Sequence, residues 1–101
     1  MLAVIFHRLA SSEFVAARRW YKRRDPALEV RFIAAVEAAV QIIETTPNLG
    51  ALFLKRYRWV RTRRFPYLLY YSSLDSSTVI VYAVVHARRR LGYWLRRVDR
   101  P

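Results

Sequence analysis

Residues 55–94 read KRYRWVRTRRFPYLLYYSSLDSSTVIVYAVVHARRRLGYW, a stretch in which strand-forming and aromatic residues recur between arginines. Three β-strands are predicted within it, at residues 59–65, 67–72 and 78–86, with a polar turn at residues 74–77. The strand at 78–86 is apolar on both faces, so we expect it to lie in the interior of a sheet. Short connections between successive strands predict an antiparallel meander.

The first half of the chain has a helical period. A short apolar strand is predicted at residues 2–7. Ser11-Ser12 predicts the N-terminal cap of a first helix at residues 13–24. Asp25-Pro26 ends this helix and begins a second one that runs to residue 45. The apolar faces are Phe14, Ala17 and Tyr21 on the first helix, and Leu28, Phe32, Val36, Val40 and Ile43 on the second.

The predicted order is β-α-α-β-β-β, followed by a short helix at residues 90–98. Because helices and strands are grouped separately, we expect an α+β fold with a helical hairpin on one face of the sheet. The opposite face and the strand ends are then expected to display the arginines. With 101 residues, the chain is expected to form a single domain spanning residues 1–101.

Composition narrows the possible chemistry. The chain has no cysteine, which excludes disulfides and a cysteine nucleophile, and its two histidines predict no metal site. We expect no cofactor. The longest apolar run, residues 79–85, is much shorter than the ~20 residues of a membrane-spanning helix, and no targeting segment is recognisable. A cytoplasmic protein without a membrane partner is expected.

Charge is distributed unevenly along the chain, whose formal net charge is +12. Residues 1–44 carry seven Lys or Arg and five Asp or Glu, a net charge of +2, whereas residues 45–101 carry twelve and two, a net charge of +10. No acidic residue lies between Glu44 and Asp75. Such a concentration of positive charge in the second half of the chain predicts a polyanionic or acidic partner. The alternative is a basic, well-solvated domain.

Several motifs together resemble a known family. They are Trp20-Tyr21, Phe32, Pro47, Arg64-Phe65-Pro66-Tyr67 with Tyr70-Tyr71, Val84-Val85-His86-Ala87-Arg88-Arg89, and Trp94. In this order they resemble the RelE/ParE superfamily of toxins from bacterial type II toxin–antitoxin systems, over almost the whole chain. The F-P-Y…Y-Y and V-x-H-x-x-R…W elements are the more specific part. The F-P-Y…H-x-x-R variant resembles ParE-like members most.

The resemblance implies a growth-inhibiting toxin with a cognate antitoxin. The antitoxin of such systems typically has a DNA-binding half, so operator DNA would be bound only through the antitoxin. A segment of the antitoxin wraps the toxin. A basic surface suits such a segment, because an acidic, partly disordered chain gains charge complementarity and apolar burial when it folds on it.

The ParE-like class implies inhibition of DNA gyrase, which requires a binding surface and no catalytic group. This interpretation is favoured. The candidate residues for binding the target or nucleic acid are Arg58, Arg61, Arg63, Arg64, Arg88, Arg89 and Trp94.

The RelE-like class implies a ribosome-dependent mRNA endoribonuclease, or mRNA interferase. Cleavage through the 2′-hydroxyl requires a base, an acid and cations for the developing phosphorane charge. The candidate catalytic residues are Arg61, His86, Arg88 and Tyr93. Trp94 falls near a tyrosine that this class uses, but an indole has no acid–base hydroxyl. Tyr93 replaces it only if the register shifts by one residue.

Several of these residues also have a purely structural interpretation. His86 at a strand end is more often a structural hydrogen-bonding group, and Trp94 is expected to fold back on the sheet. Tyr67, Tyr70 and Tyr71 alternate along a strand, so part of them must be in the core. From charge alone, a non-toxic basic module that binds nucleic acid is a third possibility.

Overall fold

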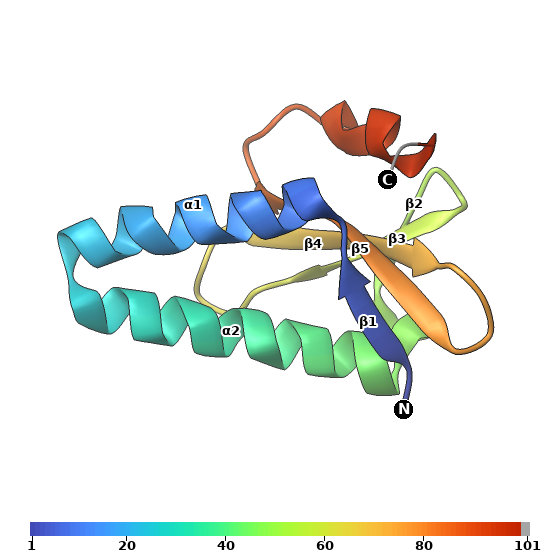
Figure 1. Ribbon diagram of the computed structural model, residues 1–101, viewed down its shortest axis with the longest axis horizontal. Helices are drawn as coiled ribbons and strands as arrows, with labels where there is room; N and C mark the ends of the chain where they lie inside the picture. The colour runs from blue at the N-terminus through green and yellow to red at the C-terminus, as the bar shows by residue number, and fades with distance from the viewer. Residues whose placement is uncertain (100–101) are drawn as a thin grey trace.

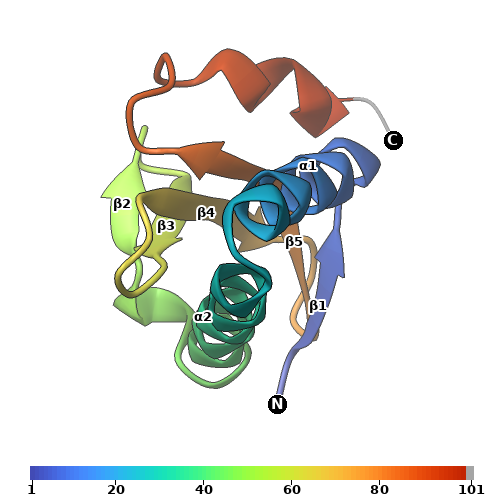
Figure 2. The ribbon, with the colours of Figure 1, turned by 90° about the vertical axis from the view of Figure 1, so that its left-hand side faces the viewer.

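A computed structural model describes residues 1–99 and shows three layers: two helices, a five-stranded sheet and a C-terminal segment (Figures 1 and 2). The elements are β1 (Ala3–Phe6), α1 (Arg8–Arg24), α2 (Pro26–Thr45), the 3-10 helix η1 (Pro47–Leu49), β2 (Ala51–Phe53), β3 (Tyr57–Arg61), β4 (Tyr67–Ser73), β5 (Thr78–His86) and the 3-10 helix η2 (Tyr93–Asp99). The α+β class and the antiparallel meander of the last three strands are confirmed.

The sheet has the strand order β1-β5-β4-β3-β2. The first strand, β1, pairs in parallel with β5, and the other neighbours are antiparallel. The expected interior position of β5 is confirmed, since it lies between β1 and β4. One strand was not predicted: β2 has only three residues, too few to display a two-residue period.

The strand predicted at residues 59–65 is wrong at both ends, because β3 begins at Tyr57 and ends at Arg61. Thr62 stops the strand. Its buried hydroxyl donates a hydrogen bond to the carbonyl of Phe65 at 2.9 Å, and its N–H donates to the carbonyl of Tyr67 at 3.0 Å. Arg64 then has a positive φ of 66°, which reverses the chain into β4.

The first helix begins earlier than predicted. The N-cap is His7, whose Nδ1 accepts the N–H of Leu9 at 3.1 Å, so the helix starts at Arg8. Ser12 lies within the helix, where its hydroxyl donates to the Arg8 carbonyl at 3.1 Å. The predicted start of α2 is confirmed: the Asp25 carboxylate accepts the N–H of Ala27 at 3.0 Å.

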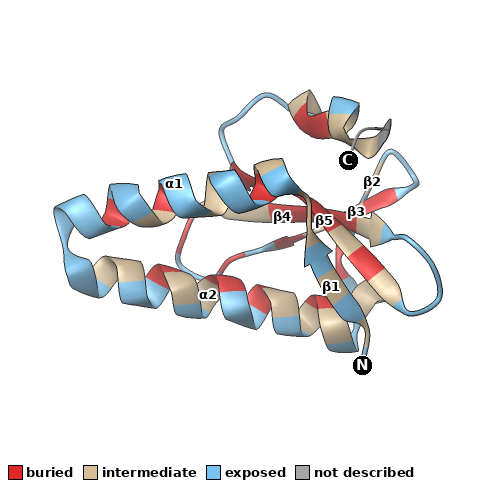
Figure 3. Ribbon diagram, viewed as in Figure 1, coloured by how far each residue is buried: buried red, intermediate tan, exposed pale blue. Residues whose placement is uncertain are grey.

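The sheet buries both of its faces. On one face, α1 and α2 cover a core that contains Ala17, Phe32 and Val36. The C-terminal segment with η2 lies over the other face (Figures 2 and 3). It covers a second core that contains Trp94. The prediction that this second face displays arginines is therefore wrong. The short helix predicted at residues 90–98 is the 3-10 helix η2. None of the helices described for residues 1–99 is long and apolar enough to cross a membrane.

Candidate functional site

One end of the sheet gathers most of the arginines that the sequence nominated. The last residue of β3, Arg61, lies opposite Leu68, and the last residue of β5, His86, lies opposite Tyr67. Since β4 pairs with both strands, these two strand ends lie about 10 Å apart at the same end of the sheet. The turns that follow these two strands extend beyond this end of the sheet.

These two turns are fastened to each other. The N–H of Ala87 donates to the carbonyl of Pro66 at 2.7 Å. This bond brings the segment after β5 beside the turn between β3 and β4. Both segments carry exposed arginines, and we call this set the cationic surface: Arg61, Arg63, Arg64, Arg88 and Arg89. None of the carboxylates of residues 1–98 forms an ion pair with any of them. Their charge is therefore available to a partner.

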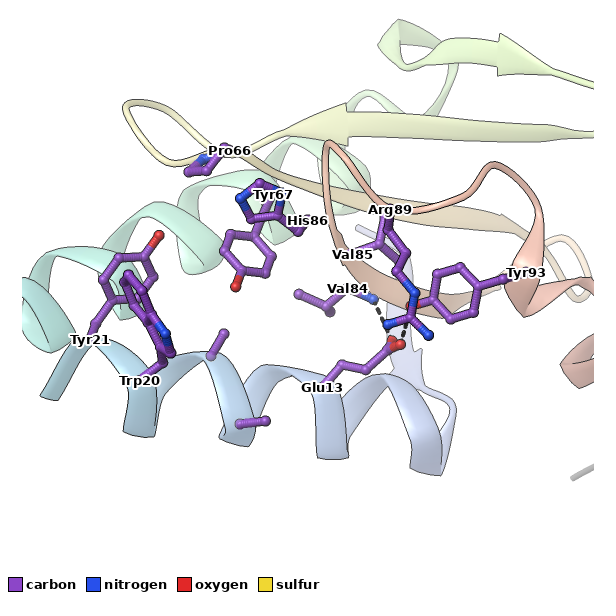
Figure 4. Close-up of a pocket in the computed structure, with 12 residues that line it drawn as sticks. Glu13, Trp20, Tyr21, Pro66, Tyr67, Val84, Val85, His86, Arg89 and Tyr93 are labelled. Atoms are coloured by element: carbon purple, nitrogen blue, oxygen red, sulfur yellow. Dashed lines mark hydrogen bonds between the residues drawn. The ribbon is translucent and has the colours of Figure 1, made fainter. Parts of the chain in front are cut away.

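A groove of about 580 Å³ runs from this end of the sheet along α1 (Figure 4). Trp20 and Tyr21 of α1 form one wall, and Tyr67, His86 and Arg89 form the other. Burial raises the pKa of Tyr21 and of Tyr67, and the proximity of the two phenols raises that of Tyr21 further. Both phenols therefore remain protonated at neutral pH and offer hydrogen-bond donors rather than bases.

His86 is exposed at the mouth of the groove, and its ring packs edge-on against Tyr67 with the centroids 5.4 Å apart. Its Nδ1 accepts the backbone N–H of Arg88 at 3.1 Å, which places the proton of the neutral ring on Nε2. The groove contains one carboxylate, that of Glu13, and its oxygens are occupied by other groups. Among the side chains of residues 1–98, His86 thus has no acidic partner to orient it.

Tyr93, the candidate acid–base residue, is fixed in a structural cluster. Its hydroxyl donates to a carboxylate oxygen of Glu13 on α1. The guanidinium of Arg97 donates to both oxygens of the same carboxylate, at 2.8 and 3.0 Å. Burial, and then the hydrogen bond and charge of Glu13, strongly raise the pKa of Tyr93. We call these three residues the Glu13 clamp, because they tie η2 to α1.

The clamp also holds the sheet. Glu13 accepts the N–H of Val84 in β5 at 3.0 Å, and Arg97 donates to the carbonyl of Tyr82 at 3.0 Å. Sequence reasoning missed Glu13 and Arg97, since they are 84 residues apart and neither belongs to a recognisable motif. The only available signal for this contact was that Glu13 is one of few acidic residues in a chain rich in arginine.

Two further nominated residues have structural roles. Trp94 is 1% exposed and contacts the rings of Phe53, Tyr57 and Tyr70, with centroids 4.9–5.8 Å away. It therefore cannot contact a target in this fold, and the expectation that it folds back on the sheet is confirmed. Arg58 is partly buried, and its guanidinium donates to the carbonyl of Gly50 at 2.7 Å. It thus secures β2 rather than extending the cationic surface.

A second groove, of about 520 Å³, lies between α2 and the turn that follows β3. Its apolar floor contains Ala34 and Ala38 of α2, and its rim carries Arg31, Arg63 and Arg64. Sequence reasoning did not nominate Arg31, which is more than 30 residues from Arg63 and Arg64 in the chain. The cationic surface is therefore bordered by two apolar grooves, one along each helix.

The described residues offer no metal centre: among residues 1–99, no group of three or more His, Cys, Asp or Glu side chains is placed to hold an ion. The site therefore consists of exposed cations next to apolar grooves. Such an arrangement can bind an acidic or phosphate-bearing partner.

Comparisons with known proteins agree with this architecture. Residues 4–91 match the model of the family described as "ParE toxin of type II toxin-antitoxin system, parDE". Among solved structures, the chain is similar to one titled "Chromosomal ParDE TA system from P. aeruginosa", with a TM-score of 0.71 and 14% sequence identity. The match covers 85% of this chain and 96% of that one. No curated protein matches the sequence.

Proposed function

Since the chain belongs to the ParE toxin family of type II toxin–antitoxin systems, we propose that it inhibits bacterial growth by poisoning DNA gyrase and that a cognate antitoxin neutralises it. In this proposal the cationic surface contacts gyrase or its bound DNA, and no reaction is catalysed by the toxin itself.

The observation that carries the proposal is that this end of the sheet has many exposed cations but no positioned acid–base pair among the described residues. Five exposed arginines are free of ion pairs with the described carboxylates, which suits binding. Cleavage of RNA requires a positioned base and acid in addition. Of the nominated groups, Tyr93 is held by Glu13, and His86 has no acidic partner among the side chains that the structure describes. Binding is the function that such a set supports best.

The antitoxin is proposed to neutralise the toxin by covering the same region. Two apolar grooves border the cationic surface, with Trp20 exposed beside one and Ala34 and Ala38 on the floor of the other. A segment that carries acidic and apolar side chains would pair with the arginines and fill the grooves as it folds. Gyrase and the antitoxin would then compete for the toxin.

A second candidate function is mRNA cleavage on the ribosome. The observation that favours it is the position of His86, exposed in the groove next to Arg89. An imidazole beside arginines supplies a proton-transfer group and cations, both of which phosphate chemistry requires.

Induced expression of the toxin without its antitoxin, followed by identification of the damage, separates the two functions. Gyrase poisoning predicts DNA covalently trapped on gyrase and induction of the SOS response. Ribonuclease action predicts mRNA cuts with codon periodicity that disappear in the Arg88→Ala and His86→Ala variants. Cuts of that kind, without trapped gyrase, contradict the proposal.

A further inference from the structure

The hairpin between β2 and β3 has an unusual turn. The N–H of Arg56 donates to the carbonyl of Phe53 at 3.3 Å, which closes a four-residue turn. Its two central residues both have positive φ, 54° for Leu54 and 60° for Lys55. This is the pattern of a type I′ turn, which strongly prefers Asn and Gly because larger side chains are strained there. Leucine and lysine are costly choices for this turn.

The base of the hairpin is held rigidly. Phe53 packs against the rings of Tyr70 and Trp94, with centroids 5.3 and 5.8 Å away. Beside it, Arg58 donates to the Gly50 carbonyl at 2.7 Å. The strained turn is therefore fixed on a well-packed sheet edge, and its conformation is formed before any partner binds.

The tip presents apolar and cationic groups together. Leu54 is 61% exposed and Leu52 is 60% exposed. Lys55 and Arg56 are also exposed, and no carboxylate whose position the structure describes, in residues 1–98, forms an ion pair with either. An exposed leucine at a strained position gains nothing from solvent. It gains free energy only if a partner buries it.

We propose that this hairpin tip is a second contact with the toxin's target: Leu54 enters an apolar pocket on a folded protein, and Lys55 and Arg56 pair with carboxylates at the rim of the pocket. The proposal rests on the proposed function, because the partner is the target of the toxin. It adds a contact that contains none of the residues of the cationic surface.

The shape of the tip indicates which kind of partner fits. A segment that folds onto the toxin would lie in a groove or pair with the backbone of an edge strand. The side chains at the tip offer neither, and both grooves described above lie elsewhere. A rigid convex tip instead requires a pocket that already exists, which a folded protein provides. Phosphate groups would pair with Lys55 and Arg56 but would leave Leu54 in water, so nucleic acid alone is the poorer fit.

The test replaces the turn with the residues that the type I′ conformation prefers, in the double variant Leu54→Asn/Lys55→Gly. Relief of strain should raise the Tm by about 5 °C. Loss of the leucine that the partner would bury, together with one cation, should weaken binding to purified gyrase about tenfold or more. Growth arrest should weaken accordingly, whereas the affinity for the antitoxin should stay the same. A more stable toxin would thus be a weaker one.

Leu74→Asn is the matched control, because Leu74 is a 59% exposed leucine near the turn between β4 and β5. It should be as toxic as the wild type. A double variant that arrests growth and binds gyrase like the wild type overturns the hairpin proposal alone. So does a double variant that loses antitoxin binding but remains fully toxic. A wild-type chain that causes no arrest overturns the proposed function and this inference with it.

Discussion

Tyr93 and Trp94 are neighbours in the chain, but their side chains point to different environments. The hydroxyl of Tyr93 binds Glu13, whereas the indole of Trp94 fills the centre of the second core. Both residues were nominated for function, and both are used to hold the C-terminal segment on the sheet. Substitutions at these two positions therefore test whether their roles are structural.

Tyr93→Phe should retain growth arrest and lose stability. The hydrogen bond to an ionised carboxylate contributes about 1.5–3 kcal/mol to the free energy of unfolding. We expect the folded variant to be as toxic as the wild type when it is expressed at the same level. A folded but non-toxic variant would show that the hydroxyl takes part in function, as the ribonuclease interpretation requires.

The same variant should change the response to alkaline pH. The pKa of Tyr93 is raised in the folded protein, so the folded state keeps this proton at a pH where the unfolded chain has released it. The contribution to stability is complete below about pH 10 and declines as the pH rises above it. Urea unfolding from pH 9 to 11 should show a shallower loss of stability for Tyr93→Phe. An unchanged slope would contradict the burial of this hydroxyl.

Trp94→Ala should lower the free energy of unfolding by about 3–5 kcal/mol, because it leaves a large cavity among aromatic rings. Trp94→Phe should cost much less. The indole Nε1 is buried without a hydrogen-bond partner, so phenylalanine loses no hydrogen bond there. Urea unfolding followed by far-UV circular dichroism measures both values. Equal effects of the two substitutions would contradict the packing described.

The C-terminal segment is attached to the rest of the molecule mainly through η2. Its aromatic residue Trp94 lies in the second core, and its Arg97 forms an ion pair with Glu13 at 2.8 Å. The side chains of this pair are mostly buried, so the attachment should depend on the carboxylate. A single substitution at Glu13 should therefore loosen the contact between η2 and α1.

Glu13→Gln should make residues near η2 exchange their amide hydrogens faster and lower the free energy of unfolding by about 2 kcal/mol. The cause is that Arg97 loses its counter-charge while partly buried. Glu29→Gln is the matched control, because the Arg18–Glu29 pair is longer, at 3.4 Å, and the side chain of Arg18 is 38% exposed against 13% for Arg97. It should change stability by at most ~1 kcal/mol. Equal effects would contradict the account of the clamp.

The elements differ in how far the sequence predicted them. Both helices and the strands β4 and β5 have enough residues for their periods to be recognised, and Asp25-Pro26 has the expected capping role. The strand β2 has three residues and no such period. The cap of α1 was assigned to serines because they are the commoner capping residues, whereas His7 performs this role. Local patterns predict local structure well.

Contacts between distant residues were the part that could not be predicted. The prediction placed arginines on the open face of the sheet as well as at the strand ends. Trp94 was expected to fold back on the sheet, but the sequence did not show how much of that face η2 covers. Likewise, Arg58 looks the same as Arg61 in the sequence, although the first is bonded to Gly50 and the second is exposed. Which arginines belong to the candidate site is decided by tertiary structure.

At the scale of the whole molecule, charge and packing are separated in space. The two cores are built from apolar and aromatic residues on the two faces of the sheet, and the cationic surface lies at one end of it. Charge that is not needed for folding is available for a partner. Removing it should therefore affect binding more than stability.

Changing the five arginines of the cationic surface to glutamine should leave the Tm within a few degrees of the wild type and abolish growth arrest. The control changes five exposed cations elsewhere to glutamine, so that its net charge equals that of the first variant. These are Arg8, Arg19, Lys22, Arg23 and Arg96. Toxicity should persist in the control. If both variants lose toxicity equally, overall charge rather than this surface is responsible.

The most direct test of the central claim uses purified components: gyrase, closed circular DNA and the toxin. After the protein is denatured, wild-type toxin should leave linear DNA that was cut and trapped on gyrase. The variant without the five arginines should leave none, and added antitoxin should prevent the cuts. Normal supercoiling without linear DNA, in the presence of a folded toxin that arrests growth in cells, would contradict gyrase poisoning.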